Sequence, residues 1–124
     1  MTDLQENQAA AEVPTDPAAH AVQMVGHHYR VEDFYEVGRE KVREFARAVQ
    51  DAHPAHYDES AAKGLGYDGL IAPITFVAIV GAIAQRRLFE EIVTGYDLSQ
   101  ILQTDQRLVL HKPMQVGDRL FCDV

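Results

Sequence analysis

The chain of 124 residues has the length of one domain, and its content of 47% hydrophobic and 24% charged residues is typical of a globular protein. The net charge of −8 argues against binding to nucleic acid or to anionic membranes, because both kinds of partner attract clustered lysine and arginine. The single cysteine, Cys122, excludes an internal disulfide and agrees with a cytoplasmic location.

The first 22 residues are rich in alanine, proline, glutamine and acidic side chains, and their hydrophobicity has no period. This composition predicts a disordered N-terminal arm over residues 1–22, followed by one domain over residues 23–124. The opening residues also lack the apolar segment of a secretory signal, so we expect no such signal.

An amphipathic helix is predicted over residues 37–50, after a segment, residues 25–36, that can hold a short strand. Apolar side chains recur in the helix at i, i+3, i+4 and i+7 and form one stripe. The members of this stripe are Val42, Phe45, Ala46 and Val49. The remaining positions carry a run of charged side chains that includes Arg39, Glu40 and Arg43, and this face is expected to be solvated.

A loop is predicted over residues 51–58, because Pro54 disfavours helical geometry at His53 before it. Residues 59–63 can form a short helical turn, and Gly64 and Gly66 would end it.

One stretch of fifteen residues without charge runs from Leu70 to Ala84. A helix that spans a membrane needs roughly 20 apolar residues, and this run is shorter and contains Pro73, so we expect no membrane span. Thr75 can cap a helix from about Phe76 to about Val93. The first half of that helix is apolar on every side, which predicts that other structure surrounds it.

Alternation with period 2 begins after the long helix and predicts strands over residues 102–111 and 119–124, joined by a turn at Gly117. Cys122 alternates with two apolar residues in the second strand, so we expect an inert, buried thiol. Two or three strands are visible in all, whereas sheets average about five or six. We therefore expect either a fragment or a sheet that another chain completes.

Residues 51–56 read Asp-Ala-His-Pro-Ala-His, which resembles the Asp-x-Asn-Pro-x-His signature of MaoC-like, hydratase-2 enzymes. Asp51, Pro54 and His56 match this signature, and His53 stands where the family has asparagine. Residues 69–74 resemble the family's Gly-x-x-x-Pro-Ile segment before its central helix. The resemblance implies an α+β hotdog fold, in which an antiparallel sheet wraps a long apolar helix, here without its C-terminal strands.

The same resemblance implies a (3R)-hydroxyacyl-thioester dehydratase or hydratase of fatty-acid elongation, in which Asp51 and His56 are the catalytic dyad. Reversible addition of water to an enoyl thioester requires proton transfer at the water and at the α-carbon, which a carboxylate and an imidazole can perform together. Backbone N–H groups of Thr75, Phe76 and Val77 would bind the thioester carbonyl at the helix start. The substrate would be carried by CoA or by acyl carrier protein, and no metal or redox cofactor is implied.

One departure from the catalytic members favours a second hypothesis. Those members have His-Gly or Gln-Gly after the Pro-Ile-x segment, whereas this chain has Phe76-Val77. In this respect, and in residues 35–41, 65–67 and 105–113, the chain resembles the A- and C-type subunits of mycobacterial β-hydroxyacyl-ACP dehydratases. Such subunits are catalytically silent, pair with a catalytic hotdog subunit and complete the acyl channel. A hotdog thioesterase is a third possibility that no motif favours.

Less specific interpretations of the same residues remain open. Asp51 and His56 flank a proline turn, where such side chains commonly bond only the loop backbone. The pairs His27-His28 and His53/His56 lack a third ligand, so no metal site is predicted. The tyrosines are expected to pack rather than to react: they include Tyr29, Tyr35, Tyr57 and Tyr67.

Overall fold

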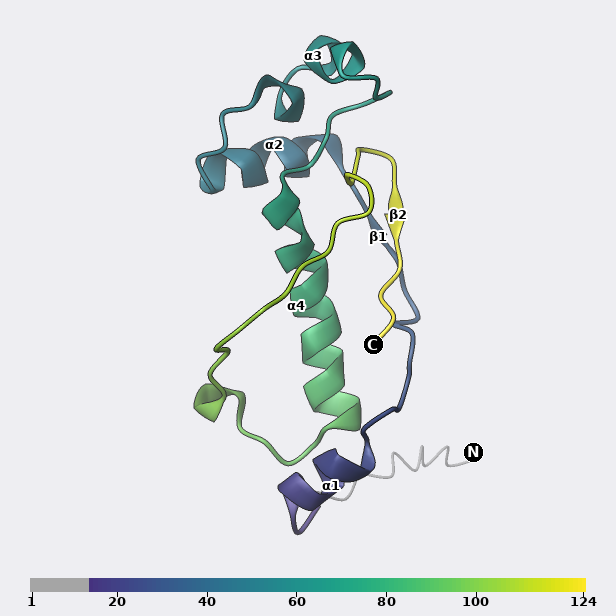
Figure 1. The fold of residues 1–124 in the computed structure, drawn as a ribbon, viewed down its shortest axis with the longest axis vertical. Helices are drawn as coiled ribbons and strands as arrows, with labels where there is room; N and C mark the ends of the chain where they lie inside the picture. Colours follow the sequence, from purple (N-terminus) through teal and green to yellow (C-terminus); the bar gives the residue numbers. More distant parts are fainter. Residues whose placement is uncertain (1–13) are drawn as a thin grey trace, which may run out of the picture.

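The computed structural model describes residues 14–124. A long central helix has shorter helices at both of its ends and a small antiparallel sheet along one side (Figure 1). The elements are α1 (Pro17–Gln23), β1 (Tyr35–Glu36), α2 (Arg39–Ala48), α3 (Glu59–Gly64), α4 (Val77–Arg87) and β2 (Arg119–Leu120). Short 3₁₀ turns lie at Pro54–His56, Ile74–Phe76 and Leu98–Gln100, and a π-helical turn lies at Leu88–Ile92.

Helix α1 corrects the predicted disorder of residues 1–22 for the part that the structure describes. The Asp16 side chain accepts a hydrogen bond from the Ala19 N–H (3.1 Å), and Pro17 has the backbone geometry that suits a first helical turn. His20 Nε2 lies 2.8 Å from the Ile92 carbonyl oxygen, so α1 rests against the far end of the central helix (Figure 1). The predicted arm before residue 14 lies outside the described residues.

The two helices around the candidate dyad form where the sequence predicted them. Helix α2 spans Arg39–Ala48 and buries Val42 and Ala46, one turn apart on the predicted apolar stripe. Helix α3 starts after Asp58, whose carboxylate accepts a hydrogen bond from the Ser60 N–H (2.9 Å), and spans Glu59–Gly64.

The central helix is continuous from the 3₁₀ turn Ile74–Phe76 through α4 to the π-helical turn Leu88–Ile92. This range confirms the predicted helix, but its predicted cap is wrong. Thr75 lies inside the 3₁₀ turn, and neither end of that turn has a side-chain cap. Helical geometry starts earlier than predicted because Pro73, with φ of −55°, leads directly into the turn.

The core lies where α2, the start of the central helix and the sheet meet. Phe76 is fully buried there and makes edge-on contacts with the rings of Phe45 (5.3 Å between centroids) and Tyr35 (6.0 Å). Val37, Val42, Leu70 and Ala72 complete the buried cluster. Aromatic pairs of this kind stabilise a core beyond the area that they bury.

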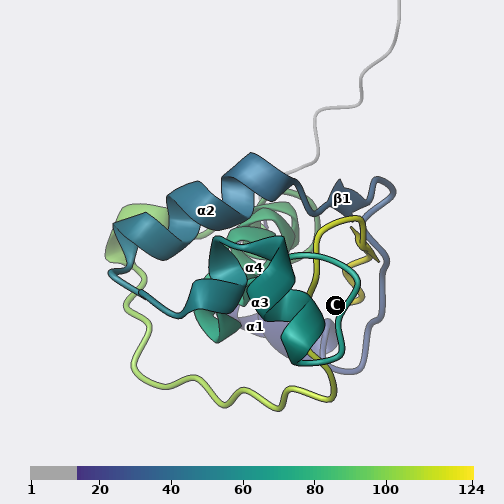
Figure 2. The same ribbon diagram turned by 90° about the horizontal axis from the view of Figure 1, so that it is seen from above.

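The predicted strands near residues 25–36 and 119–124 are confirmed as one antiparallel pair. Tyr35 pairs with Leu120 and Glu36 with Arg119, and an isolated bridge joins Arg30 to Asp123. The pairing covers one side of α4, as the view along the helix shows (Figure 2). A second bridge, Ile71 to Gln115, ties the segment before α4 to the segment before β2.

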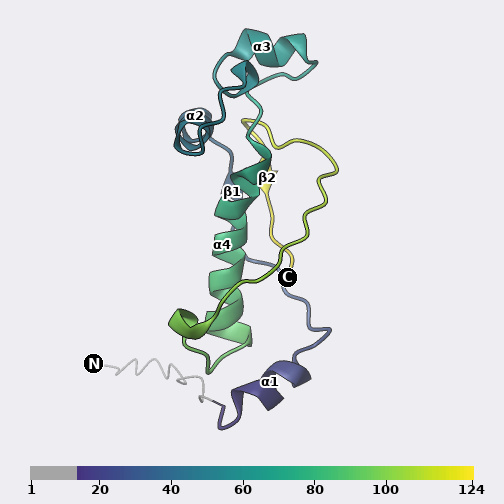
Figure 3. The same cartoon turned by 60° about the vertical axis from the view of Figure 1, so that its left-hand side comes forward.

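The predicted strand over residues 102–111 is absent. These residues form neither strand nor helix, and they run past α4 as an open loop on the way to β2 (Figure 3). A strand requires a partner for its N–H and C=O groups, and no described segment runs beside this one. Consequently Leu102 is 84% exposed, and Ile83 on α4 is 40% exposed, so the apolar helix is covered on one side only.

No helix among residues 14–124 combines the length and apolar character that crossing a bilayer requires.

Candidate active site

Asp51 is placed by the way in which helix α2 ends. The Asp51 N–H donates to the Ala46 carbonyl (2.9 Å) and the Gln50 N–H donates to the Arg47 carbonyl (3.1 Å). This pair of bonds ends a helix when the first residue beyond it, here Gln50, adopts left-handed geometry. Gln50 does so with φ of 58°, which is strained for a residue other than glycine. The chain therefore turns sharply at Gln50 and directs Asp51 away from the helix axis.

His56 is placed by the proline turn that follows. The His53 ring Nδ1 accepts a hydrogen bond from the Ala55 N–H (3.1 Å) and caps the 3₁₀ turn Pro54–His56. His53 thus performs the capping that asparagine, the family residue at this position, also performs well. The turn buries His56, which is only 8% exposed.

Both ring nitrogens of His56 have acceptors within reach. Nδ1 lies 2.5 Å from the Ile71 carbonyl oxygen, and Nε2 lies 3.1 Å from Asp51 Oδ2. A carbonyl can only accept, so Nδ1 must donate there. The remaining contact then needs one proton between Nε2 and the Asp51 carboxylate. This geometry is that of a pair able to exchange a proton with a third group.

The charge on Asp51 is stabilised by its immediate neighbours. The His53 backbone N–H donates to Asp51 Oδ1 (3.1 Å), and this bond, together with the nearby His56 ring, holds the pKa of Asp51 below its usual range. The Asp51 side chain is 40% exposed, so the carboxylate is accessible from outside while His56 is covered. Near neutral pH the pair therefore contains an ionised carboxylate.

The dyad faces a pocket with otherwise apolar walls and a volume of about 350 Å³. Asp51, His53 and His56 supply its only titratable side chains. The other lining residues come from four parts of the chain: Ala55, Leu65, Ile71, Ala72, Ile74, Leu110, Pro113 and Met114. A polar pair on the wall of an apolar pocket is the usual arrangement of a site that binds an apolar substrate and acts on one polar group.

The sequence-predicted carbonyl-binding residues do not join the dyad at this pocket. Ile74, the first residue of the 3₁₀ turn that starts the central helix, lines the pocket, whereas Thr75, Phe76 and Val77 do not. Thr75 is exposed, and Phe76 is fully buried in the core. The Phe76 N–H donates to the Pro73 carbonyl (2.9 Å), and the Val77 N–H donates inside the 3₁₀ turn. The hydrogen bonds of this turn therefore occupy the N–H groups of Phe76 and Val77.

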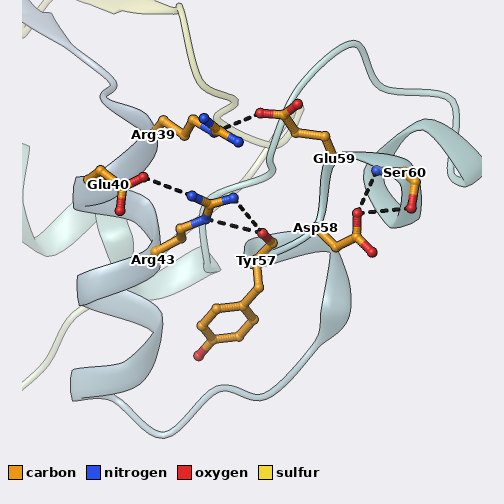
Figure 4. A network of polar contacts seen from close by, with 7 residues as sticks. All are labelled: Arg39, Glu40, Arg43, Tyr57, Asp58, Glu59 and Ser60. Carbon is orange, nitrogen blue, oxygen red and sulfur yellow. Dashed lines mark hydrogen bonds and ion pairs between the residues drawn. The ribbon is translucent and has the colours of Figure 1, made fainter.

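Two residues that the sequence did not single out brace the dyad loop (Figure 4). Arg43 donates to the Tyr57 carbonyl from Nε (3.1 Å) and from a terminal nitrogen (2.9 Å), and its other terminal nitrogen reaches Glu40 (2.8 Å). The sequence predicts a solvated face for Arg43 and a packing role for Tyr57. Spacing in sequence gave no sign of this contact, because it joins α2 to a loop that only the fold brings beside it.

Among residues 14–124, no three histidine, cysteine or acidic side chains gather in a way that could hold a metal ion. The Cys122 thiol is partly buried near the Val80 carbonyl (3.8 Å), and burial raises the pKa of that thiol.

Comparison with known proteins identifies the family. The family model for the FAS1-like dehydratase domain region matches residues 23–124. The chain belongs to this family. A UPF0336 protein of Mycolicibacterium paratuberculosis is 44% identical over 100 residues, which cover 81% of the chain and 58% of that protein. A UPF0336 protein of Mycobacterium tuberculosis is 50% identical over 93 residues, covering 75% of the chain and 56% of that protein.

Two solved structures share both sequence and fold with the chain. A C-terminally truncated HadBC complex from Mycobacterium tuberculosis, a (3R)-hydroxyacyl-ACP dehydratase, contains a chain with 47% identity and a TM-score of 0.71. The match covers 78% of this chain and 71% of that one. A MaoC-like dehydratase has 48% identity and a TM-score of 0.67, over 79% of this chain and 30% of that one. These likenesses confirm the predicted α+β hotdog fold and its MaoC-like family. The chain spans about three-fifths of the length of its curated relatives.

Proposed function

We propose that this chain is part of a (3R)-hydroxyacyl-thioester dehydratase and that its own Asp51–His56 pair transfers the protons. The observation that carries the proposal is the 3.1 Å contact between His56 Nε2 and Asp51 Oδ2 on the wall of an apolar pocket. The family and the likeness to a (3R)-hydroxyacyl-ACP dehydratase support this reaction class. The carrier is CoA or acyl carrier protein.

The reaction removes a proton from the α-carbon and a hydroxyl group from the β-carbon, and it yields an enoyl thioester and water. One member of the pair accepts the α-proton, and the pair returns a proton to the departing hydroxyl group. Asp51 and His56 can divide this work because His56 Nε2 and Asp51 Oδ2 lie within hydrogen-bond distance of each other, at 3.1 Å. The apolar walls, which include Ile71 and Met114, would accept the first carbons of the acyl chain and limit the access of water.

The dyad is tested by Asp51→Asn and His56→Gln, which keep size and hydrogen bonding but remove the titrating group. Each change should lower kcat for hydration of crotonyl-CoA and of a longer enoyl-CoA by about 10²–10⁴-fold. The double variant should lose little more, because residues that act as one unit are not additive. The assay uses the full-length protein with and without a partner hotdog subunit. Rates that stay within about threefold of wild type in an active complex would assign the chemistry to the partner.

A second candidate is the catalytically silent subunit of a heterodimer, and one observation favours it. The N–H groups of Phe76 and Val77 are bonded within the 3₁₀ turn, so neither is free to polarise a thioester carbonyl. In this case a partner hotdog subunit supplies the catalytic groups, and this chain contributes an apolar wall of the acyl channel. The truncated HadBC structure, a complex, supports pairing with a second hotdog subunit.

Neither candidate requires a cofactor. We also infer a cytoplasmic location, where acyl thioesters are made and where the free thiol of Cys122 stays reduced.

A further inference from the structure

The loop that carries the dyad is held by Tyr57, a residue that does not line the pocket. Tyr57 follows His56 directly and uses three polar groups to fix the loop. Its N–H donates to the Pro54 carbonyl (3.0 Å), its hydroxyl donates to the Asp51 carbonyl (2.6 Å), and its own carbonyl accepts from Arg43. The hydroxyl bond closes the loop from its last residue back to its first.

Arg43 anchors this closed loop to helix α2. Two nitrogens of its guanidinium group converge on the Tyr57 carbonyl, at 3.1 and 2.9 Å, and Glu40 on the same helix holds the third. The guanidinium is planar and always charged, so it fixes direction as well as distance. The Arg43 side chain is 23% exposed, whereas Arg39, one turn earlier, is 53% exposed and pairs with Glu59 at the surface. Arg39, an arginine of the same helix, therefore serves as the control for Arg43 (Figure 4).

The dyad needs such a brace because its Asp51 side is less constrained than its His56 side. Asp51 lies next to the strained Gln50, and its side chain is 40% exposed. His56, in contrast, is fixed by the Ile71 carbonyl. Any movement of the Asp51 backbone would change the distance to a ring that cannot follow. Misplacement by about 1 Å is enough to cost a large part of a catalytic rate.

We propose that Tyr57 and Arg43 are positioning residues of the dyad: the Tyr57 hydroxyl sets the Asp51 backbone against His56, and Arg43 fixes Tyr57 to helix α2. The kinetic test of this inference rests on the proposed function. The placement of Asp51 by Tyr57 can also be tested without catalysis.

The kinetic test is Tyr57→Phe, which removes one oxygen, compared with Tyr67→Phe, whose hydroxyl has no hydrogen bond within the described residues. Tyr57→Phe should lower kcat for enoyl-CoA hydration about tenfold, the kinetic equivalent of one hydrogen bond, and leave KM within about twofold. Tyr67→Phe should change neither. In an Asp51→Asn background, Tyr57→Phe should cost less than about twofold, because there is no carboxylate left to position.

Arg43→Lys keeps the charge but not the planar fork, so it should lower kcat in the same way, whereas Arg39→Lys should not. Thermal unfolding of every variant separates a folding defect from a positioning defect. Equal kcat values for Tyr57→Phe and wild type, or a full tenfold loss for Tyr57→Phe in the Asp51→Asn background, would overturn the proposal.

If the wild-type complex hydrates no enoyl thioester, the proposed function has failed, and the Asp51 carboxyl resonance then decides the inference. In ¹³C NMR titrations, Tyr57→Phe should raise the pKa of Asp51 toward its ordinary value, because the His53 N–H and the His56 ring no longer hold the carboxylate. Tyr67→Phe should leave it unchanged. An Asp51 titration that is the same in Tyr57→Phe and wild type would overturn the brace itself.

Discussion

The two ends of the central helix are stabilised in different ways. At its start, α2, the proline turn and the segment around Met114 converge, so Phe76 is fully buried and the backbone of Ala72 bonds to that of Met114 (2.8 Å). Beyond its end, nearly every side chain from residue 95 to residue 112 is exposed, and no described strand accompanies them. The end that carries the candidate dyad is thus folded by the chain's own contacts, whereas the other end leaves apolar surface that a further chain segment or subunit can cover.

The largest expected difference between the two ends is in stability. Phe76→Ala should lower the free energy of unfolding by about 3–5 kcal/mol, because it removes a buried ring that two aromatic side chains contact. Leu102→Ala should change it by less than about 0.5 kcal/mol. Urea denaturation followed by circular dichroism measures both. Similar losses for the two variants would mean that residue 102 is buried in solution, and the comparison of the two ends would be wrong.

The next largest effect should be the stabilisation of the chain by a partner that covers the exposed end. A catalytic MaoC-like subunit that binds only the folded chain should stabilise it by about 2.7 kcal/mol when its free concentration is one hundred times Kd. The complex should be stoichiometric in size-exclusion chromatography and should melt at a higher temperature than either chain. Ile83→Asp, on the exposed side of α4, should abolish this shift if the partner covers that side. A shift of the same size with Ile83→Asp would place the partner elsewhere.

A smaller effect is expected at the junction between α2 and the dyad loop. Gln50→Gly relieves left-handed geometry at φ of 58° and should raise the free energy of unfolding by up to about 1 kcal/mol. Gly64, which has no positive φ, provides the control: Gly64→Ala should not lower stability through backbone strain. Thermal unfolding resolves changes of this size. A loss of stability in Gln50→Gly would show that the Gln50 side chain itself stabilises the loop.

The smallest effect concerns the pH dependence of stability. The pKa of Asp51 is lower in the folded chain than in the unfolded chain, so its ionised form stabilises the fold above the ordinary aspartate pKa of about 4. That contribution is lost as the pH falls through the lower, folded pKa. Asp51→Asn should therefore flatten the stability profile as the pH falls from about 5 through the folded pKa of Asp51, which urea denaturation of the variant and of wild type across this range measures. Identical profiles for Asp51→Asn and wild type would refute the assignment.

Local patterns in the sequence were sufficient for much of this structure. The spacing of Val42 and Ala46 predicted α2, the apolar run after Pro73 predicted the central helix, and alternation before Val124 predicted the strand that pairs near Tyr35. Such patterns work because a helix or strand repeats its environment over a few residues. The five-residue spacing of Asp51 and His56 around a proline turn likewise brought the two side chains within 3.1 Å.

Tertiary contacts decided what those patterns could not. The strand predicted near Leu108 did not form, because alternation in one segment does not supply a neighbouring strand. The 3₁₀ turn at the start of the central helix engages the N–H groups of Phe76 and Val77, two of the three expected to bind a carbonyl, because the turn begins before Thr75. Arg43 reached Tyr57 only because α2 and the dyad loop pack together. Sequence alone thus determined helices α2 and α4 and which two groups lie close enough to share a proton. The fold determined which segments pair as strands and which distant groups surround the dyad, since contacts between segments depend on packing and not on spacing.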